Sequence, residues 1–252
     1  MHIPRVHDLG FDSEDSIKES KFSKKDYKIN DYISVHVPTL GEIFDFGQRE
    51  YMGIVSSLVA TPYEAMVMLD DMGIDFTTVD EWFVFELMFS YFASKYKKIK
   101  IIFGDLDLSL FESAIKPETG DKILYDFEHG YTIDRLAQQQ ISSVLREILV
   151  FPKNDKNPGN EVTKKHLIAK ERKRIRRAAE KDGNQLEDLM LALVNTPEYK
   201  YNFDESMNLT LYQFNACVKQ IQKKISFDHR MNGIYAGTVD VSKIDRNDLT
   251  WI

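Results

Sequence analysis

The chain has 252 residues, 43% hydrophobic and 29% charged, which is typical of a globular protein with a sizeable core. The formal net charge of −7 excludes a global attraction to DNA or to an anionic membrane. The single cysteine, Cys217, excludes an intrachain disulfide and a cysteine-rich zinc site. The first residues lack a signal-peptide pattern, and no stretch approaches the roughly 20 apolar residues of a membrane helix. We therefore expect a cytoplasmic protein.

The first elements in chain order are a polar arm and a strand. Residues 1–25 are polar with mixed charge, and we expect them to be loosely attached. Alternation in the next segment places Ile33, Val35 and Val37 on one face, which predicts a strand that Pro38 ends.

Three helix-start signals follow. Thr39 with Glu42 forms a capping-box pattern, which predicts a helix to Phe46 with Gly47 as its stop. A second helix over 48–60 turns five apolar residues inward: Tyr51, Ile54, Val55, Leu58 and Val59. The pattern at 61–64 predicts a helix to Met72, and Thr78 with Glu81 predicts the start of an aromatic helix.

The rest of the first half mixes strands with one helix. The sequence KIKIIFG at 98–104 reads as a strand, and residues 114–134 read as two or three short strands joined by turns. Residues 135–151 form an amphipathic pattern, which predicts a helix with its apolar residues inward: Leu136, Ile141, Val144, Leu145 and Ile148.

The second half reads as nearly all helix. We interpret 152–160, which is rich in Pro, Asn and Gly, as a linker between an α+β domain at 26–151 and a helical domain at 161–252 with an apolar tail. The predicted fold class is α+β and predominantly helical, with small antiparallel β elements in the N-terminal half and an all-helical C-terminal half.

A dense basic run is the strongest candidate for a binding site. Its members are Lys164, Lys165, Lys170, Arg172, Lys173, Arg174, Arg176 and Arg177. Cations this dense on one helix repel each other. The run is a solvated face, a surface for an acidic protein partner, or a phosphate-binding surface, although it lacks the interleaved aromatics of single-strand binders.

Trp251 in the final LTWI is a second candidate. It fills a pocket on its own chain or anchors a partner, since tryptophan is enriched at binding hot spots.

Two acidic pairs need an interpretation. Asp105 and Asp107 follow a predicted strand, where paired acids hold Mg²⁺ or form a turn that caps the segment before Ser109. Asp70 and Asp71 end a predicted helix, where the dipole disfavours acids. No nucleotide-binding motif, catalytic triad or paired-histidine spacing occurs, so we predict no catalytic residue, no metal ligand and no cofactor.

A resemblance to a protein family is carried by ordered blocks after about Lys25. These blocks are PTLGEIFDFGQREYMGIVSSLVATPYEAMVMLDDMGIDF, IIFGDLDL, LALVNTPEYKYNF, LYQFNACVKQIQKK and GIYAGTVDVSKIDRNDLTWI. They resemble a family of proteins from tailed bacteriophages and prophages of Gram-positive bacteria. The resemblance implies a role in tail morphogenesis, as a tail assembly chaperone that binds the tape-measure protein and tail-tube subunits. No catalytic residues come with that family.

The predicted function is therefore that of a non-enzymatic phage protein, which binds phage tail proteins in the bacterial host cytoplasm. One alternative is a structural virion component, such as a connector or baseplate subunit. Others are a Mg²⁺-dependent nuclease that uses Asp105 and Asp107, or a nucleic-acid binder through 164–177. We expect no membrane partner.

Overall fold

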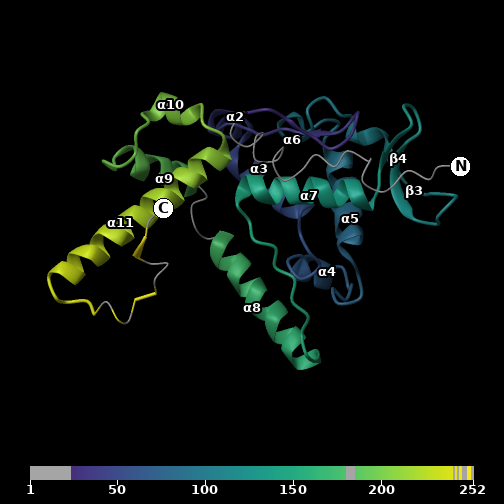
Figure 1. Cartoon of the computed structure of the whole chain (residues 1–252). Coiled ribbons are helices and arrows are strands. Elements are labelled where there is room, and N and C mark those ends of the chain that lie inside the picture. The colour runs from purple at the N-terminus through teal and green to yellow at the C-terminus, as the bar shows by residue number, and fades with distance from the viewer. Residues whose placement is uncertain (1–23, 180–184, 241, 243, 246–248, 251–252) are drawn as a thin grey trace, which may run out of the picture.

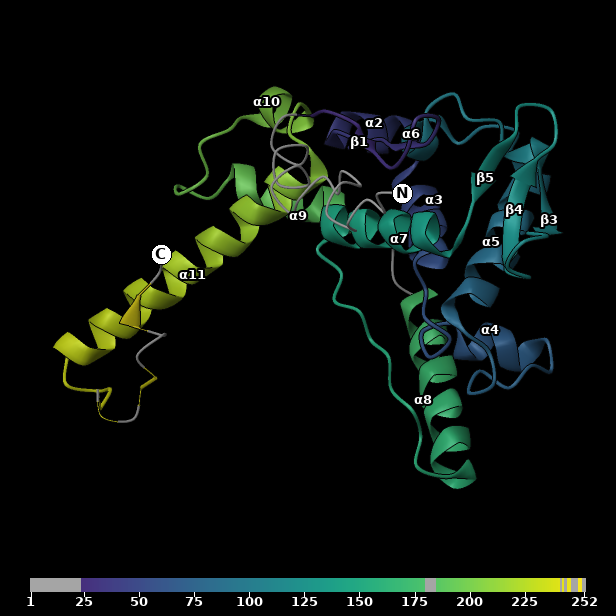
Figure 2. The ribbon, with the colours of Figure 1, turned by 45° about the vertical axis from the view of Figure 1, so that its right-hand side comes forward.

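The computed structural model describes residues 24–179, 185–240, 242, 244–245 and 249–250. Most of the predicted polar arm, and the candidate Trp251, lie outside the described residues. Helix α7 runs through the middle of the molecule, and helices α8 and α11 extend from it in different directions (Figures 1 and 2).

A short hairpin opens the described chain. Strands β1 (Tyr27–Lys28) and β2 (Ser34–Val35) pair antiparallel, with Tyr27 opposite Val35. Ile33, Val35 and Val37 are all buried, so the predicted inward face is confirmed. The strand itself is shorter than the alternation indicated, because residues 29–33 form the turn.

Helices α2 (Leu40–Phe46) and α3 (Gln48–Leu58) follow their sequence signals. The Glu42 carboxylate accepts the Thr39 amide at 2.7 Å, and the Thr39 hydroxyl accepts the Glu42 amide at 3.3 Å. This capping box was predicted. Gly47 has φ of 105°, a conformation that favours glycine, and it ends α2 where α3 begins. The five inward residues predicted for α3 are buried.

The starts of the next two helices differ from prediction. Thr61 and Glu64 make the expected reciprocal bonds, but residues 62–65 form turns and α4 spans only Met66–Asp71. Helix α5 (Glu81–Lys95) begins after Asp80, whose carboxylate accepts the Phe83 amide at 2.9 Å. Asp80 therefore caps α5 in place of the predicted Thr78.

The segment predicted as a strand at 98–104 contains helix α6 (Lys100–Phe103), so that prediction was wrong. Ile101, Ile102 and Phe103 are all buried. A short apolar run that is buried on every side has no alternation to separate strand from helix. The Ile102 carbonyl accepts the amide of His36, which attaches α6 to the β2 segment.

A three-stranded antiparallel sheet follows the short 3₁₀ helix η2 (Leu108–Leu110), as the turn signals predicted. Its strands are β3 (Phe111–Ile115), β4 (Lys122–Asp126) and β5 (Tyr131–Ile133), in the order β3-β4-β5.

Helix α7 (Arg135–Leu149) packs against the sheet, β2, α5 and α11. Four of its five predicted inward residues are buried, but Leu136 is 51% exposed. Gln138 and Ser142 are buried on this helix instead, and the Gln138 amide donates to the Ser142 hydroxyl at 3.1 Å. This bond satisfies polar atoms that burial would otherwise leave without a partner.

The second half is helical, as predicted, with α8 (Glu161–Ala179), α9 (Gln185–Val194), α10 (Phe203–Met207) and α11 (Leu211–Tyr235). Leu211 and Phe214 of α11 belong to the same apolar cluster as Leu40 of α2. The Leu40 amide also donates to the Leu209 carbonyl at 2.9 Å. One apolar core thus joins both sides of 152–160. The fold class is confirmed as α+β and predominantly helical.

None of the helices formed by the described residues has the length and apolar character needed to cross a membrane.

Candidate functional site

Helix α8 carries the basic run. It begins after Asn160, whose side chain accepts the Thr163 amide at 2.8 Å while its carbonyl accepts the Lys164 amide. A thin apolar stripe that includes Leu167 and Ile168 packs on a small cluster around Leu69. No residue of α8 is fully buried. The helix therefore lies on the surface and is attached along one side, beside α4 (Figure 2).

One cation of the run, Lys164, attaches the first turn of α8 to the loop between α4 and α5. Its ammonium lies 2.8 Å from the carboxylate of Asp75. This hydrogen bond, together with those from the amide and hydroxyl of Thr77, lowers the pKa of Asp75 to about 2. The Lys164 ammonium therefore has an ion-pair partner within the chain.

Arg172 forms ion pairs with the two acids at the C-terminal end of α4. Its guanidinium donates to Asp70 at 2.7 Å and to Asp71 at 2.6 Å. The unfavourable position of these acids at a helix C-terminus is thus offset by a cation from another helix. Arg174 pairs within α8 with Glu171 at 2.8 Å. Lys164, Arg172 and Arg174 of the predicted partner-binding set thus make ion pairs within the chain, and their role in partner binding stays a prediction.

The remaining five cations form what we call the basic face. Its members are Lys165, Lys170, Lys173, Arg176 and Arg177. All five are exposed and, within the part of the chain that the structure describes, none makes an ion pair. At 3.6 residues per turn they fall within about 140° of the helix circumference, on the side away from the apolar stripe. The basic face is a compact positive surface.

A hollow lies on each side of the basic face. One, of about 650 Å³, is lined by Asp70, Ile168 and several cations. The other, of about 510 Å³, is lined by Tyr63, Met66 and Leu167 beside Lys173. Apolar side chains are thus accessible next to the charges, a mixture that occurs in protein interfaces.

Asp105 and Asp107 are engaged with other side chains. Asp105 lies 3.2 Å from Lys100 and 3.4 Å from Lys98, and the hydrogen bond from Lys100 lowers the pKa of its carboxyl. Asp107 accepts the amide and hydroxyl of Ser109 at 3.1 and 2.6 Å. The interpretation of a turn that caps the segment before Ser109 is confirmed for Asp107. Within the described ranges, no group of three acids, histidines or cysteines could hold a metal ion.

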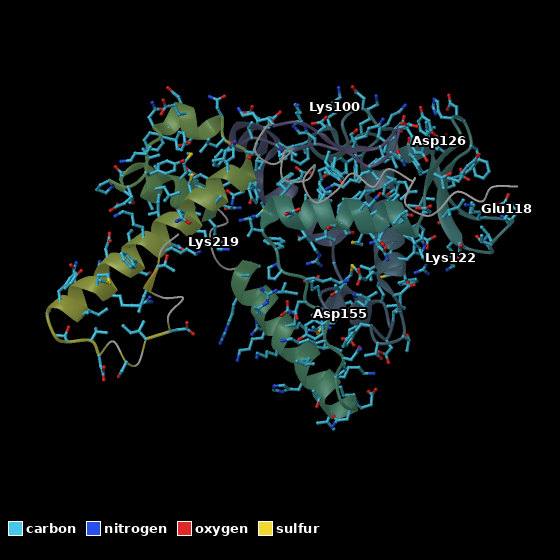
Figure 3. The ribbon with its side chains drawn as sticks, in the orientation of Figure 1. Lys100, Glu118, Lys122, Asp126, Asp155 and Lys219 are labelled. Atoms are coloured by element: carbon cyan, nitrogen blue, oxygen red, sulfur yellow. The ribbon has the colours of Figure 1, made fainter. Side chains whose placement is uncertain are left out.

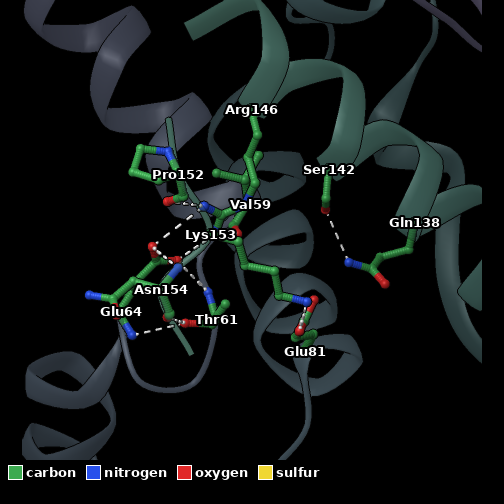
Figure 4. Close-up of polar contacts among 10 residues, drawn as sticks. All are labelled: Val59, Thr61, Glu64, Glu81, Gln138, Ser142, Arg146, Pro152, Lys153 and Asn154. Atoms are coloured by element: carbon green, nitrogen blue, oxygen red, sulfur yellow. Dashed lines mark hydrogen bonds and ion pairs between the residues drawn. The ribbon is translucent and has the colours of Figure 1, made fainter. Parts of the chain in front are cut away.

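The hydrogen-bond hub around Arg146 was not predicted. Its guanidinium donates to the Val59 carbonyl at 2.5 Å and to the Pro152 carbonyl at 3.1 Å, and it pairs with the Glu64 carboxylate. Glu64 also accepts the Asn154 amide at 3.3 Å (Figure 4). The hub fixes the segment that leads to α8. The helix-start pattern at 61–64 could have identified Glu64, but no neighbouring residue in the sequence indicates that Arg146 is its partner.

A comparison with protein families gives one match. Residues 177–252, from the last turn of α8 to the end of the chain, match the family model described as the YomV second domain, from a Bacillus prophage-type protein. The match indicates a phage-related protein. No curated protein and no solved structure matches the chain.

Proposed function

We propose that this phage-related chain is a non-enzymatic protein that acts in tail assembly, as a chaperone that binds the tape-measure protein and tail-tube subunits. The observation that carries the proposal is the basic face of α8. Five cations without an ion-pair partner among the described residues repel each other on one helix, and this cost is recovered when an acidic surface covers them. An acidic stripe on a partner helix fits this elongated surface.

The apolar hollows favour a protein over a nucleic acid as the occupant. Tyr63 and Leu167 are only partly buried and offer apolar area that can be buried at the centre of an interface, whereas phosphate contacts need cations alone. The net charge of −7 also gives the whole molecule a repulsive field toward nucleic acid. The resemblance of the sequence blocks to phage tail proteins supplies the candidate partners.

The test is co-purification with the tape-measure and tail-tube proteins of the same phage. The triple variant Lys165→Glu/Lys173→Glu/Arg176→Glu is expected to lose binding, because it reverses the basic face. Lys122→Glu/Lys219→Glu/Lys223→Glu changes the net charge equally at exposed positions. Lys122 lies at the sheet, away from α8 (Figure 3), and Lys219 and Lys223 belong to α11, so this control is expected to bind as the wild type does.

Three outcomes would overturn the proposal. If neither tail protein is captured at about micromolar concentration, the chaperone function fails. If the chain is found in purified virions by mass spectrometry, it is a structural component, because an assembly chaperone leaves the particle. Binding of DNA that needs the basic face and falls steeply with salt would instead assign a nucleic-acid function.

A further inference from the structure

The sheet β3-β4-β5 has two edges, and they differ. At the β5 edge, the Tyr32 hydroxyl donates to the Thr132 carbonyl and accepts the Thr132 amide, both at 2.9 Å. A side chain from the β1–β2 hairpin therefore closes that edge. Strand β3 is the other edge and lies at the outer side of the sheet (Figure 2). No strand among the described residues pairs with its outer side.

The direction of the main-chain groups of β3 follows from the pairing register. The main-chain N–H and C=O of Thr132 point outward, to Tyr32. Tyr125 lies opposite Thr132, so the N–H and C=O of Tyr125 point the other way, toward Glu112 of β3. Alternation along β3 then turns the N–H and C=O of Ser113 and Ile115 to the open edge. Neither residue makes a main-chain hydrogen bond to another described segment outside the sheet.

Strand β3 carries one exposed charge, Glu112, and among the described residues it otherwise lacks the usual protection of an edge. Natural edges carry proline, lysine or a bulge that prevents pairing with another chain. Residues 111–115 read FESAI, with neither proline nor lysine, and pair with β4 without a break in register. Ile115 is 67% exposed. An exposed β-branched apolar residue beside unpaired main-chain groups favours an added strand.

We propose that β3 pairs antiparallel with β3 of a second copy of this chain, with Ser113 on the two-fold axis. In this register Ser113 lies opposite Ser113, and Ile115 lies opposite Phe111 of the other copy. Glu112 lies opposite Ala114, so the two carboxylates do not face each other. The sequence of β3 is thus self-complementary, which a two-fold interface requires.

The proposed register also matches the available donors. The Phe111 amide is already bonded to the Leu108 carbonyl, whereas the amides of Ser113 and Ile115 bond to no other segment of the described chain. Each copy therefore donates from Ser113 to Ser113 and from Ile115 to the Phe111 carbonyl. These bonds would join the two sheets into a continuous sheet across the axis.

The first test measures mass in solution by light scattering at concentrations up to about 100 µM. The wild type is expected to form a dimer. Ser113→Pro removes the outward amide from both copies and is expected to weaken dimerisation at least about tenfold. Ser113→Ala is the matched control: it also loses the Ser113 hydroxyl bond to Glu86, but it keeps the amide and is expected to dimerise normally.

The second test does not depend on the proline variant folding. Directly opposite hydrogen-bonded residues have Cα atoms about 5.5 Å apart, within disulfide range. In a Cys217→Ala background, Ser113→Cys is expected to cross-link two copies on mild oxidation, and Glu112→Cys is expected to cross-link far more slowly. A wild-type chain that stays monomeric, or equal cross-linking at both positions, would overturn the proposal.

Discussion

Arg146 shows how one side chain can order a segment that has no regular structure. Its side chain is 11% exposed and contacts Glu64 and the carbonyls of Val59 and Pro152. The carboxylate and both carbonyls would lose a charged donor if the guanidinium were removed. The cost of such a loss is the desolvation of the groups left without a partner.

We predict that Arg146→Ala lowers the free energy of unfolding by about 2–3 kcal/mol, the scale for hydrogen bonds to a charged group. Urea denaturation measures this change. Arg174→Ala removes an arginine that is 72% exposed and pairs within its own helix, so a loss of at most about 0.5 kcal/mol is expected. Equal losses for the two variants would contradict the role of the hub.

Asp75 gives a prediction for pH. Its pKa is about 2 in the folded chain against an ordinary value of 3.8, so the folded state favours the ionised carboxylate. The stability that this provides is present above pH 3.8 and is lost as the pH falls through about 2.

The variant Asp75→Asn is therefore expected to be less stable than the wild type at pH 6, and the difference should narrow as the pH falls below 3.8. Denaturation curves at several pH values test this. Asp155→Asn removes an exposed carboxylate that makes no ion pair in the described chain and should show no such narrowing. A difference that does not vary with pH would refute the assignment.

At the scale of elements, α8 is attached to the body through few contacts. Leu167 and Ile168 pack on the cluster around Leu69, and Lys164 and Arg172 make its ion pairs to the α4 region. Elements with little buried apolar area open at lower free energy than the core does. The helix that carries the basic face is therefore expected to open at lower free energy than the core.

We predict that Leu167→Ala/Ile168→Ala speeds hydrogen exchange of the α8 amides while the α7 amides keep their protection. The expected loss in local opening free energy is about 1 kcal/mol for each half-buried side chain. Exchange followed by mass spectrometry measures this difference. Val162→Ala, at a side chain 78% exposed, should leave exchange unchanged. Loss of protection throughout the chain would show that α8 does not open separately.

The elements themselves were largely predictable where local chemistry decides them. The Thr39 capping box, the Gly47 stop and the turns of the three-stranded sheet are short-range signals, and each formed. Prediction was wrong for α6, because burial on all sides removes the periodicity that distinguishes a helix from a strand. It was also wrong for Leu136, whose exposure depends on what packs against the first turn of α7.

At the scale of the whole molecule, the core crosses the predicted linker. Phe214 is fully buried in the cluster that contains residues of α2, α5 and α7. The Leu211 amide donates to the Pro38 carbonyl at 3.1 Å, so the two halves also share main-chain bonds. The division into domains at 152–160 stays a prediction, and unfolding can test it.

We expect Phe214→Ala to lower the free energy of unfolding by about 3–5 kcal/mol. Because the core is shared, two probes should report one main unfolding transition, and Phe214→Ala should shift it equally in both. The probes are Trp82 fluorescence, in a Trp251→Phe background, and far-UV circular dichroism. Tyr235→Ala, at a side chain 80% exposed, should change the free energy of unfolding by less than about 0.5 kcal/mol. A Trp82 transition unaffected by Phe214→Ala would show that the halves fold independently.

The amino-acid sequence by itself determined the fold class, most helix starts and stops, and the presence of a basic helix, because caps, turns and periodicity depend on neighbours along the chain. Only the tertiary structure decided which of the cations on α8 lack an ion-pair partner among the described residues. Asp70, Asp71 and Asp75 are far from α8 in the sequence, and packing of α8 on α4 brings them within ion-pair distance. The candidate site is therefore the basic face, the cations of α8 for which folding supplies no partner among the described residues. No pattern of neighbouring residues in the sequence identifies that set.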